Sequence, residues 1–185
     1  MHSHWISQTI PYDGSQLRSH WIYEATGSLG DAIAAWCGPA RVDATHMVDL
    51  EDRASKAWIE SRSMLHFLIE HFAMDLLQAI VWQRLLVAIA REELGHRVRD
   101  SRFRRCGNDL FDGDAKLSVS IATVSPVSAM VHFGINIISD GTPVPTRGLT
   151  EYAIDPVTFA HTVMERYCDE VRSSIRASAK VRAVR

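Results

Sequence analysis

The residue types most able to do chemistry lie in one short stretch near the middle of the chain. Asn108 and Asp109 lie near the end of one predicted strand, and Lys116 opens the next after the turn Asp112-Gly113. Lysine is a compact positive charge, and a carboxylate can bind Mg²⁺ or a ribose hydroxyl. These residues leave two interpretations open: an exposed hairpin with a surface ion pair, worth at most about 1 kcal/mol, or the charged part of a binding site.

The elements that must position these side chains are predicted from apolar spacing and turn residues. The predicted strands are 5–10, 31–36, 102–108, 116–123 and 129–138, the last closed by Asp140-Gly141. Residues 42–50 are a strand or an extended loop, and the predicted helices are 15–23, 63–72, 76–94 and 156–179. This order of strands and helices predicts an α+β or mixed α/β fold.

The final helix has the most regular pattern. Asp155 is a good N-cap, and Pro156 suits the first helical position. Apolar residues then recur at every fourth position: Phe159, Val163, Tyr167, Val171 and Ile175. The spacing predicts an amphipathic helix whose apolar stripe packs on a sheet.

Two signatures resemble those of the biotin and lipoate protein ligases. That family has an Arg-Asn-Asp-apolar segment, a short turn, and then a lysine followed by an apolar and a small residue; here Asn108-Asp109 and Lys116 match. The segment 131–137, with His132, Gly134 and Asn136, is similar to the family's second signature strand. The resemblance covers about 104–137 and implies a mixed or antiparallel sheet flanked by helices.

The chain as a whole is more similar to an uncharacterised family of small prokaryotic proteins, the domain of unknown function 366. The matching phrases are Tyr12-Asp13-Gly14-Ser15-Gln16-Leu17, Met47-Val48-Asp49-Leu50-Glu51-Asp52, Gln83-Arg84-Leu85-Leu86, Lys116-Leu117-Ser118-Val119-Ser120-Ile121-Ala122-Thr123 and His132-Phe133-Gly134-Ile135-Asn136. That family resembles the biotin/lipoate ligase and class II synthetase fold. The resemblance implies a single domain over 1–185 and names a fold better than a function.

The ligase resemblance implies an acyl-adenylate-forming ligase or acyltransferase that acts on a small carboxylic acid or its adenylate. ATP and Mg²⁺ are the implied cofactors, and an acyl-carrier protein is an implied partner. Lys116 would neutralise the acyl phosphate, and Asp109 would help to hold metal or ribose. The candidate substrate- or cofactor-binding residues are Arg18, Asn108, Ser118, Ser120, His132, Gly134 and Asn136.

The sequence also departs from the ligases. Val119 stands where they usually have a glycine that lets backbone approach the ligand closely. The glycine- and arginine-rich adenylate loop of biotin ligases is missing, and Arg18 is the nearest basic candidate. No cysteine follows the His132 strand where octanoyltransferases of this fold have one, which disfavours thioester chemistry. A non-catalytic small-molecule or nucleotide-binding module that kept the fold is therefore the alternative hypothesis.

Two further polar clusters have weaker patterns. His66, Glu70 and His71 resemble a zinc-binding helix, but the spacing is one residue off and no metal site is expected there. The segment 47–52 holds three acidic residues. It is either a polar strand end or an edge that recognises a magnesium phosphate or an amine.

Composition excludes several classes of protein. A net charge of −2 disfavours a nucleic-acid binder, and the chain contains no apolar run of about 18 residues that could span a membrane. The three cysteines form no CxxC pair, so we expect a reducing, cytoplasmic environment and no disulfide framework. The five tryptophans and the lack of a second domain favour a homodimer.

Overall fold

A five-stranded sheet lies at the centre of the computed structural model, which describes residues 1–55, 58–99, 102–140 and 144–184. The strands follow the order β1-β2-β3-β8-β7. β1 runs parallel to β2 and the other neighbours are antiparallel, so the sheet is mixed. The strands are β1 (His2–Trp5), β2 (Ala32–Val42), β3 (Ile59–Phe72), β7 (Ser118–Val124) and β8 (Ser128–Ile138).

A second sheet of three short strands carries Asp109 and Lys116, the two residues to which the sequence gave catalytic roles. Its strands are β4 (Phe103–Cys106), β5 (Asp109–Asp112) and β6 (Ala115–Lys116). Leu117 separates β6 from β7, so the predicted strand 116–123 is divided between the two sheets. The backbone of Leu117 joins them, because its N–H donates to Leu110 and its carbonyl accepts from Asn136.

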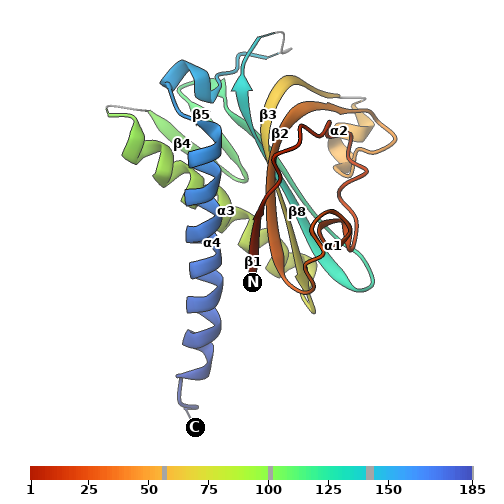
Figure 1. Ribbon diagram of the computed structural model, residues 1–185, viewed down its shortest axis with the longest axis vertical. Helices are drawn as coiled ribbons and strands as arrows, with labels where there is room; N and C mark the ends of the chain where they lie inside the picture. The colour runs from red at the N-terminus through yellow and green to blue at the C-terminus, as the bar shows by residue number, and fades with distance from the viewer. Residues whose placement is uncertain (56–57, 100–101, 141–143, 185) are drawn as a thin grey trace.

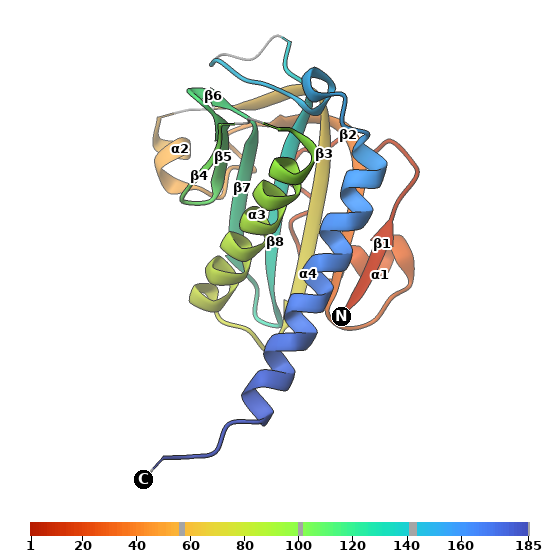
Figure 2. The ribbon, with the colours of Figure 1, turned by 90° about the vertical axis from the view of Figure 1, so that its left-hand side faces the viewer.

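Two long helices cover one face of the main sheet (Figures 1 and 2). They are α3 (Leu76–Arg97) and α4 (Pro156–Ala179). The chain between β1 and β2, with α1 (Trp21–Thr26), and the segment after β2, with α2 (Leu50–Ala54), lie on the opposite side (Figure 1). The short 3-10 helix η1 (Leu149–Tyr152) precedes α4. This arrangement confirms the predicted mixed fold with helices around a central sheet.

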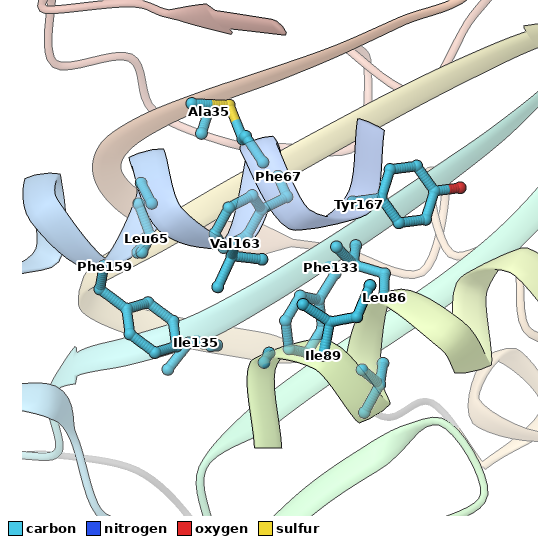
Figure 3. Close-up of a cluster of buried hydrophobic side chains, with 14 of the residues drawn as sticks. Ala35, Leu65, Phe67, Leu86, Ile89, Phe133, Ile135, Phe159, Val163 and Tyr167 are labelled. Carbon is cyan, nitrogen blue, oxygen red and sulfur yellow. The ribbon is translucent and has the colours of Figure 1, made fainter. Parts of the chain in front are cut away.

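The main hydrophobic core lies between the sheet and the two long helices. Figure 3 shows aromatic and aliphatic side chains meeting from all three layers: Leu65, Phe67, Phe133 and Ile135 from the sheet, Leu86 and Ile89 from α3, and Phe159, Val163 and Tyr167 from α4. Asp155 caps α4 by accepting from the backbone N–H of Thr158 at 2.8 Å. The predicted stripe of α4 is confirmed as far as Val171, whereas Ile175 is 63% exposed because α4 extends beyond the sheet (Figure 2).

The predicted helix 63–72 is wrong, because these residues form most of the central strand β3. Leu65, Phe67 and Ile69 face the core under the helices. Alternate residues such as Leu68 are buried on the other face. A strand that is buried on both faces has no polar alternation, so its apolar spacing was compatible with a helix.

Other predicted bounds also change. Residues 6–10 continue beyond β1 without forming a strand, and α1 begins at Trp21 rather than near Ser15, whose side chain bonds Asp13. Of the two alternatives for 42–50, the strand is wrong beyond Val42: residues 43–49 form a turn and a loop, and α2 follows them. The strand β5 was not predicted, and Gly141 of the predicted turn lies outside the described residues. The predicted helix 76–94 is confirmed and extends to Arg97.

Gly38 allows the segment before α1 to lie directly on β2. A Cβ atom at Gly38 would stand 2.0 Å from the backbone oxygen of Ile10. Hydrogen bonds hold this segment on β2: Trp36 Nε1 donates to the Ile10 oxygen at 3.0 Å, the Ile10 N–H donates to the Cys37 carbonyl at 3.3 Å, and Tyr12 exchanges backbone bonds with Pro39 and Arg41. Tyr12 is thereby held over the face of the main sheet that α3 and α4 leave uncovered.

Candidate functional site

A cavity of about 500 Å³ lies on the face of the main sheet that is opposite α3 and α4. This volume is typical of a site for a small molecule. Its lining comes from Tyr12 and Leu17, the segments 42–52 and 58–61, Met64 of β3, the hairpin residues Asn108, Asp109 and Lys116, β7, His132 and Asn136 of β8, and Val144 and Thr146. The cavity therefore includes both signature segments that the sequence indicated.

Lys116 and Asp109 form an ion pair in this lining, with Lys116 Nζ 2.8 Å from Asp109 Oδ2. The Lys116 backbone is fixed on both sides: its N–H donates to the Pro145 oxygen at 2.9 Å, and its carbonyl accepts from the N–H of Arg147 at 3.2 Å. Burial raises the pKa of Asp109 in spite of the lysine beside it, and the charge of Asp52 adds to this effect. The pair is thus partly removed from water rather than a fully exposed surface pair.

The other charged residues of the lining are acidic. Asp49, Asp52 and Glu60 join Asp109, whereas Lys116 is the one lysine or arginine among the described lining residues. Asp49 caps α2 through the backbone N–H groups of Glu51 and Asp52. In the described chain no three histidine, cysteine or acidic side chains are placed to hold a metal ion together. An anionic ligand would therefore meet a single positive side chain and several carboxylates.

Three of the predicted binding residues line the cavity: Asn108, Ser118 and Ser120. Their side chains form hydrogen bonds with other parts of the protein. Asn108 Nδ2 donates to the Ser120 carbonyl at 2.6 Å. The Ser118 hydroxyl accepts from the N–H of Leu110 at 2.8 Å, and the Ser120 hydroxyl accepts from Gln83 of α3 at the same distance. Both serines pair with core residues of β8, so their side chains face the helices. These contacts indicate a supporting role.

Asn136 and Gly134 lie on the cavity side of β8. Asn136 lines the cavity and its side chain makes a long contact of 3.5 Å with the Arg147 carbonyl. Gly134 does not line the cavity; a Cβ there would stand 2.8 Å from the methyl group of Met64, which occupies that space. Val119, opposite Gly134, lines the cavity with its side chain.

His132 belongs to an aromatic cluster at the floor of the cavity. Tyr12 stacks on the His132 ring at 3.7 Å between centroids, with 7° between the planes. His132 Nε2 lies 3.0 Å from Nδ1 of His66, whose Nε2 lies 3.1 Å from the Gly38 carbonyl oxygen. Burial lowers the pKa of His66 to about 4, and burial together with His66 lowers the pKa of His132 well below its usual value.

Two other sequence hypotheses change with the structure. Arg18 does not line the cavity, because its guanidinium pairs with Glu24 at the surface. His66 and His71 lie on opposite faces of β3: His66 faces the cavity side, and His71 bonds Asp31 and Tyr167 at 2.9 Å each. The motif 66–71 therefore lies on a strand and not on the helix that the sequence suggested.

Sequence reasoning missed residues that line the cavity or lie beneath it. His66 was considered only as a metal ligand on a helix, and the matching phrase with Tyr12 gave no role for its ring. The acidic segment 47–52 does reach the cavity, with Asp49 and Asp52 in the lining. Because these residues are distant in the chain from Lys116, their spacing along it carried no signal.

The chain belongs to the family of the domain of unknown function 366 (DUF366), whose model matches residues 1–182. A protein of unknown function from Pyrococcus horikoshi is 36% identical, with a TM-score of 0.92 and complete coverage of both chains. An uncharacterized protein of Methanocaldococcus jannaschii is 34% identical over 141 residues, which are 74% of this chain. The matched part is 63% of the length of that curated relative.

The fold is that of the biotin and lipoate protein ligases. Biotin protein ligase from Aquifex aeolicus, in complex with biotin and ATP, superimposes with a TM-score of 0.62 at 16% identity, covering 92% of this chain and 70% of that one. A proposed lipoate protein ligase from T. acidophilum with bound lipoic acid gives a TM-score of 0.57 at 11% identity, covering 92% and 86%. At this identity the likeness concerns the fold alone.

Proposed function

We propose that this protein is an acyl-adenylate-forming ligase or acyltransferase that acts on a small carboxylic acid. The observation that carries the proposal is the position of the Lys116–Asp109 pair in a cavity of about 500 Å³. Because Lys116 sits on a backbone that neighbouring strands and residues 145–147 fix, its ammonium can be held where negative charge develops. The described helices include none that could cross a membrane.

In the proposed reaction, a carboxylate oxygen of the acid attacks the α-phosphorus of ATP. A new oxygen–phosphorus bond forms, the bond to the β-phosphate breaks, and pyrophosphate leaves with the electron pair. Lys116 stabilises the negative charge on the acyl-phosphate oxygens, and Asn136 orients the ligand at the same end of the cavity. Asp109 holds the Lys116 ammonium in place.

Asp109 and Asp52 are the residues that would hold Mg²⁺. Their carboxylates are close enough for the charge of Asp52 to raise the pKa of Asp109, and both line the cavity. Two carboxylates together with substrate phosphates fit the usual binding of this ion, which rarely needs a complete protein cage. Mg²⁺ there would neutralise phosphate charge that one lysine cannot.

The test is a screen of ATP, Mg²⁺ and short carboxylic acids, with pyrophosphate release and thermal shift as readouts. We expect release with at least one acid, stabilisation by a non-hydrolysable acyl-adenylate analogue, and loss of both in Lys116→Ala. Lys180→Ala, an exposed lysine beyond α4, is the matched control and should behave as wild type. If no adenylate analogue stabilises the wild-type protein, the proposal is wrong.

A non-catalytic small-molecule or nucleotide-binding module is the second candidate. Val119 favours it, because its side chain occupies part of the cavity where the ligases usually have glycine. The arginine-rich loop is also missing, and Arg18 does not replace it. Such a module would be stabilised by a ligand but would release no pyrophosphate with any acid, so the same screen separates the two candidates.

A further inference from the structure

The hydrogen bonds beneath the cavity fix the protons of two buried histidines. The Gly38 carbonyl can only accept, so the His66 Nε2 that lies 3.1 Å away must carry a proton. His66 is fully buried and enclosed by the rings of Trp36 and Tyr12, where a neutral imidazole is favoured. Its Nδ1 is therefore a bare acceptor.

The tautomer of His66 in turn fixes the tautomer of His132. Its Nε2 lies 3.0 Å from the bare Nδ1 of His66, so Nε2 of His132 must carry the proton of that bond. His132 is only 3% exposed and has no carboxylate among its described bonding partners, so nothing there stabilises a charged ring. As a neutral ring, it presents Nδ1 as an unprotonated acceptor.

The Nδ1 atom of His132 has no hydrogen-bond partner in the described part of the chain, and it is not among the atoms that are sealed from solvent without one. The residue lines the cavity, where its neighbours Tyr12, Met64 and Ile121 are largely apolar. More than nine-tenths of the His132 side chain is buried, and an unpaired acceptor on such a ring costs free energy unless a ligand or a water molecule donates a hydrogen bond to it.

We propose that His132 Nδ1 is a specificity-determining acceptor that selects carboxylic acids bearing a neutral hydrogen-bond donor, a hydroxyl or an amide N–H, at the end remote from the carboxylate. This inference rests on the proposed function, because it places the reacting carboxylate near Lys116 and Asn136. His132 and Asn136 lie four residues apart on one face of β8, which is about 13 Å along the strand. One ligand of moderate length reaches both ends.

The chain of bonds makes this acceptor selective. His132 cannot offer a proton at Nδ1 without breaking its bond to His66 or becoming charged in a buried aromatic cluster. A purely aliphatic acid would leave the acceptor unpaired, and an acid with a remote anionic group would meet a lone pair. His66 is thus a positioning residue, since it acts on the ligand only through His132.

The experiment compares straight-chain carboxylic acids of increasing length with the corresponding ω-hydroxy acids, measured by calorimetry on the full chain. Each pair differs by one hydroxyl, which in an apolar pocket without an acceptor would weaken binding. We expect the hydroxy acid of the best-fitting length to bind about tenfold tighter than its partner. If no hydroxy acid in the series binds tighter than its aliphatic partner, the inference is overturned.

Nitrogen NMR of histidine-labelled protein supplies a second readout that does not depend on a variant folding. In the free protein we expect both His66 and His132 to show a protonated Nε2 and a bare Nδ1. The hydroxy acid, and not the aliphatic acid, should shift the His132 Nδ1 signal. A protonated Nδ1 on His132 in the free protein would contradict the inference.

His132→Leu should remove the preference within each pair, whereas His161→Gln, an exposed histidine of α4, should keep it. Pyrophosphate release separates this inference from the proposed function. Selective binding without release overturns the proposed function alone. Equal release with both members of every pair supports the proposed function and overturns the role of His132.

Discussion

The side-chain amide of Asn108 donates to the carbonyl oxygen of Ser120 at 2.6 Å and so ties the short hairpin sheet to β7 of the main sheet. The bond stands beside Asp109, which with Lys116 forms the charged end of the cavity. Asn108 was a candidate ligand from its motif. In the structure its described contact positions the residue that follows it.

We therefore expect Asn108→Ala and Asn108→Asp to destabilise the protein by about 1–2 kcal/mol, because each removes the donor and leaves a partly buried carbonyl unpaired. Both variants should also weaken binding of an acyl-adenylate analogue, since Asp109 loses its support. Urea unfolding and thermal shift measure the two effects. Wild-type stability in both variants would show that the bond contributes nothing.

The ionised Asp109 carboxylate should lower the free energy of unfolding at neutral pH. Its pKa is raised in the folded state, mainly by burial, so the folded protein holds the proton more tightly than the unfolded chain. Stability is then greatest when the carboxyl is protonated and falls as the pH rises through its folded pKa. Asp109→Asn removes this dependence while keeping the shape of the side chain.

At pH 7 we expect the midpoint of thermal unfolding of Asp109→Asn to be unchanged or higher than that of the wild type. A gain of about 1 kcal/mol in the free energy of unfolding would raise it by roughly 2–4 °C. The gain should disappear in acid, where wild-type Asp109 is protonated. Asp43→Asn, at an exposed carboxylate whose pKa is lowered by its bonds to Thr45, is a control that should lose stability at pH 7 instead. A clear loss at pH 7 in Asp109→Asn would mean that the Lys116 pair outweighs burial.

The histidine pair predicts the opposite dependence on pH. The folded-state pKa of His66 is about 4, below the value of 6.5 in an unfolded chain, and that of His132 is lowered as well. The unfolded chain therefore binds more protons between these values, and stability falls as the pH falls from 6.5 toward 4. For His66 alone, the free energy of unfolding at pH 5 should be about 2 kcal/mol lower than at neutral pH.

Chemical unfolding at several pH values checks this prediction. His66→Gln should flatten the slope between pH 6.5 and 5 whatever its effect at neutral pH. His161→Gln should leave the slope unchanged, because that histidine is exposed on α4. A wild-type protein with no loss of stability in this range would contradict the neutral pair.

Local signals in the sequence predicted the elements that have local causes. The helix α4 begins where Asp155 and Pro156 place it, because a cap and a proline at the first turn act within a few residues. The Lys116–Asp109 contact also follows from a hairpin between close neighbours in the chain. Both features could be predicted from residue types and their spacing along the chain.

The central strand β3 and the floor of the cavity have causes that are not local. Leu65 is buried under the helices and Leu68 on the other face, so β3 shows no alternation by which a strand is recognised. His66 and His132 are 66 residues apart in the chain, and Tyr12 reaches them from the N-terminal segment. Only the sheet register brings these rings together.

Gly38 holds this floor in place through its lack of a side chain. Because a Cβ atom would stand 2.0 Å from the Ile10 oxygen and 2.8 Å from the Ile10 carbon, both backbone atoms, Gly38→Ala must displace the segment that carries Tyr12. We expect a loss of about 2 kcal/mol or more in the free energy of unfolding, typical of a steric clash with backbone in a packed region.

Gly38→Ala should disturb the floor of the cavity as well as destabilise the fold. When the segment moves, Trp36 loses its bond to the Ile10 oxygen and Tyr12 loses its stacking on His132. The Trp36 side chain should become more accessible, so a neutral quencher should reduce its fluorescence more strongly. The difference in affinity between hydroxy and aliphatic acids should decrease. Gly27→Ala is the matched control: its φ of 74° makes alanine costly, but nothing lies near its Cβ position. If Gly27→Ala and Gly38→Ala lose the same stability and keep the same quenching, the close approach at Gly38 does not hold the cavity floor.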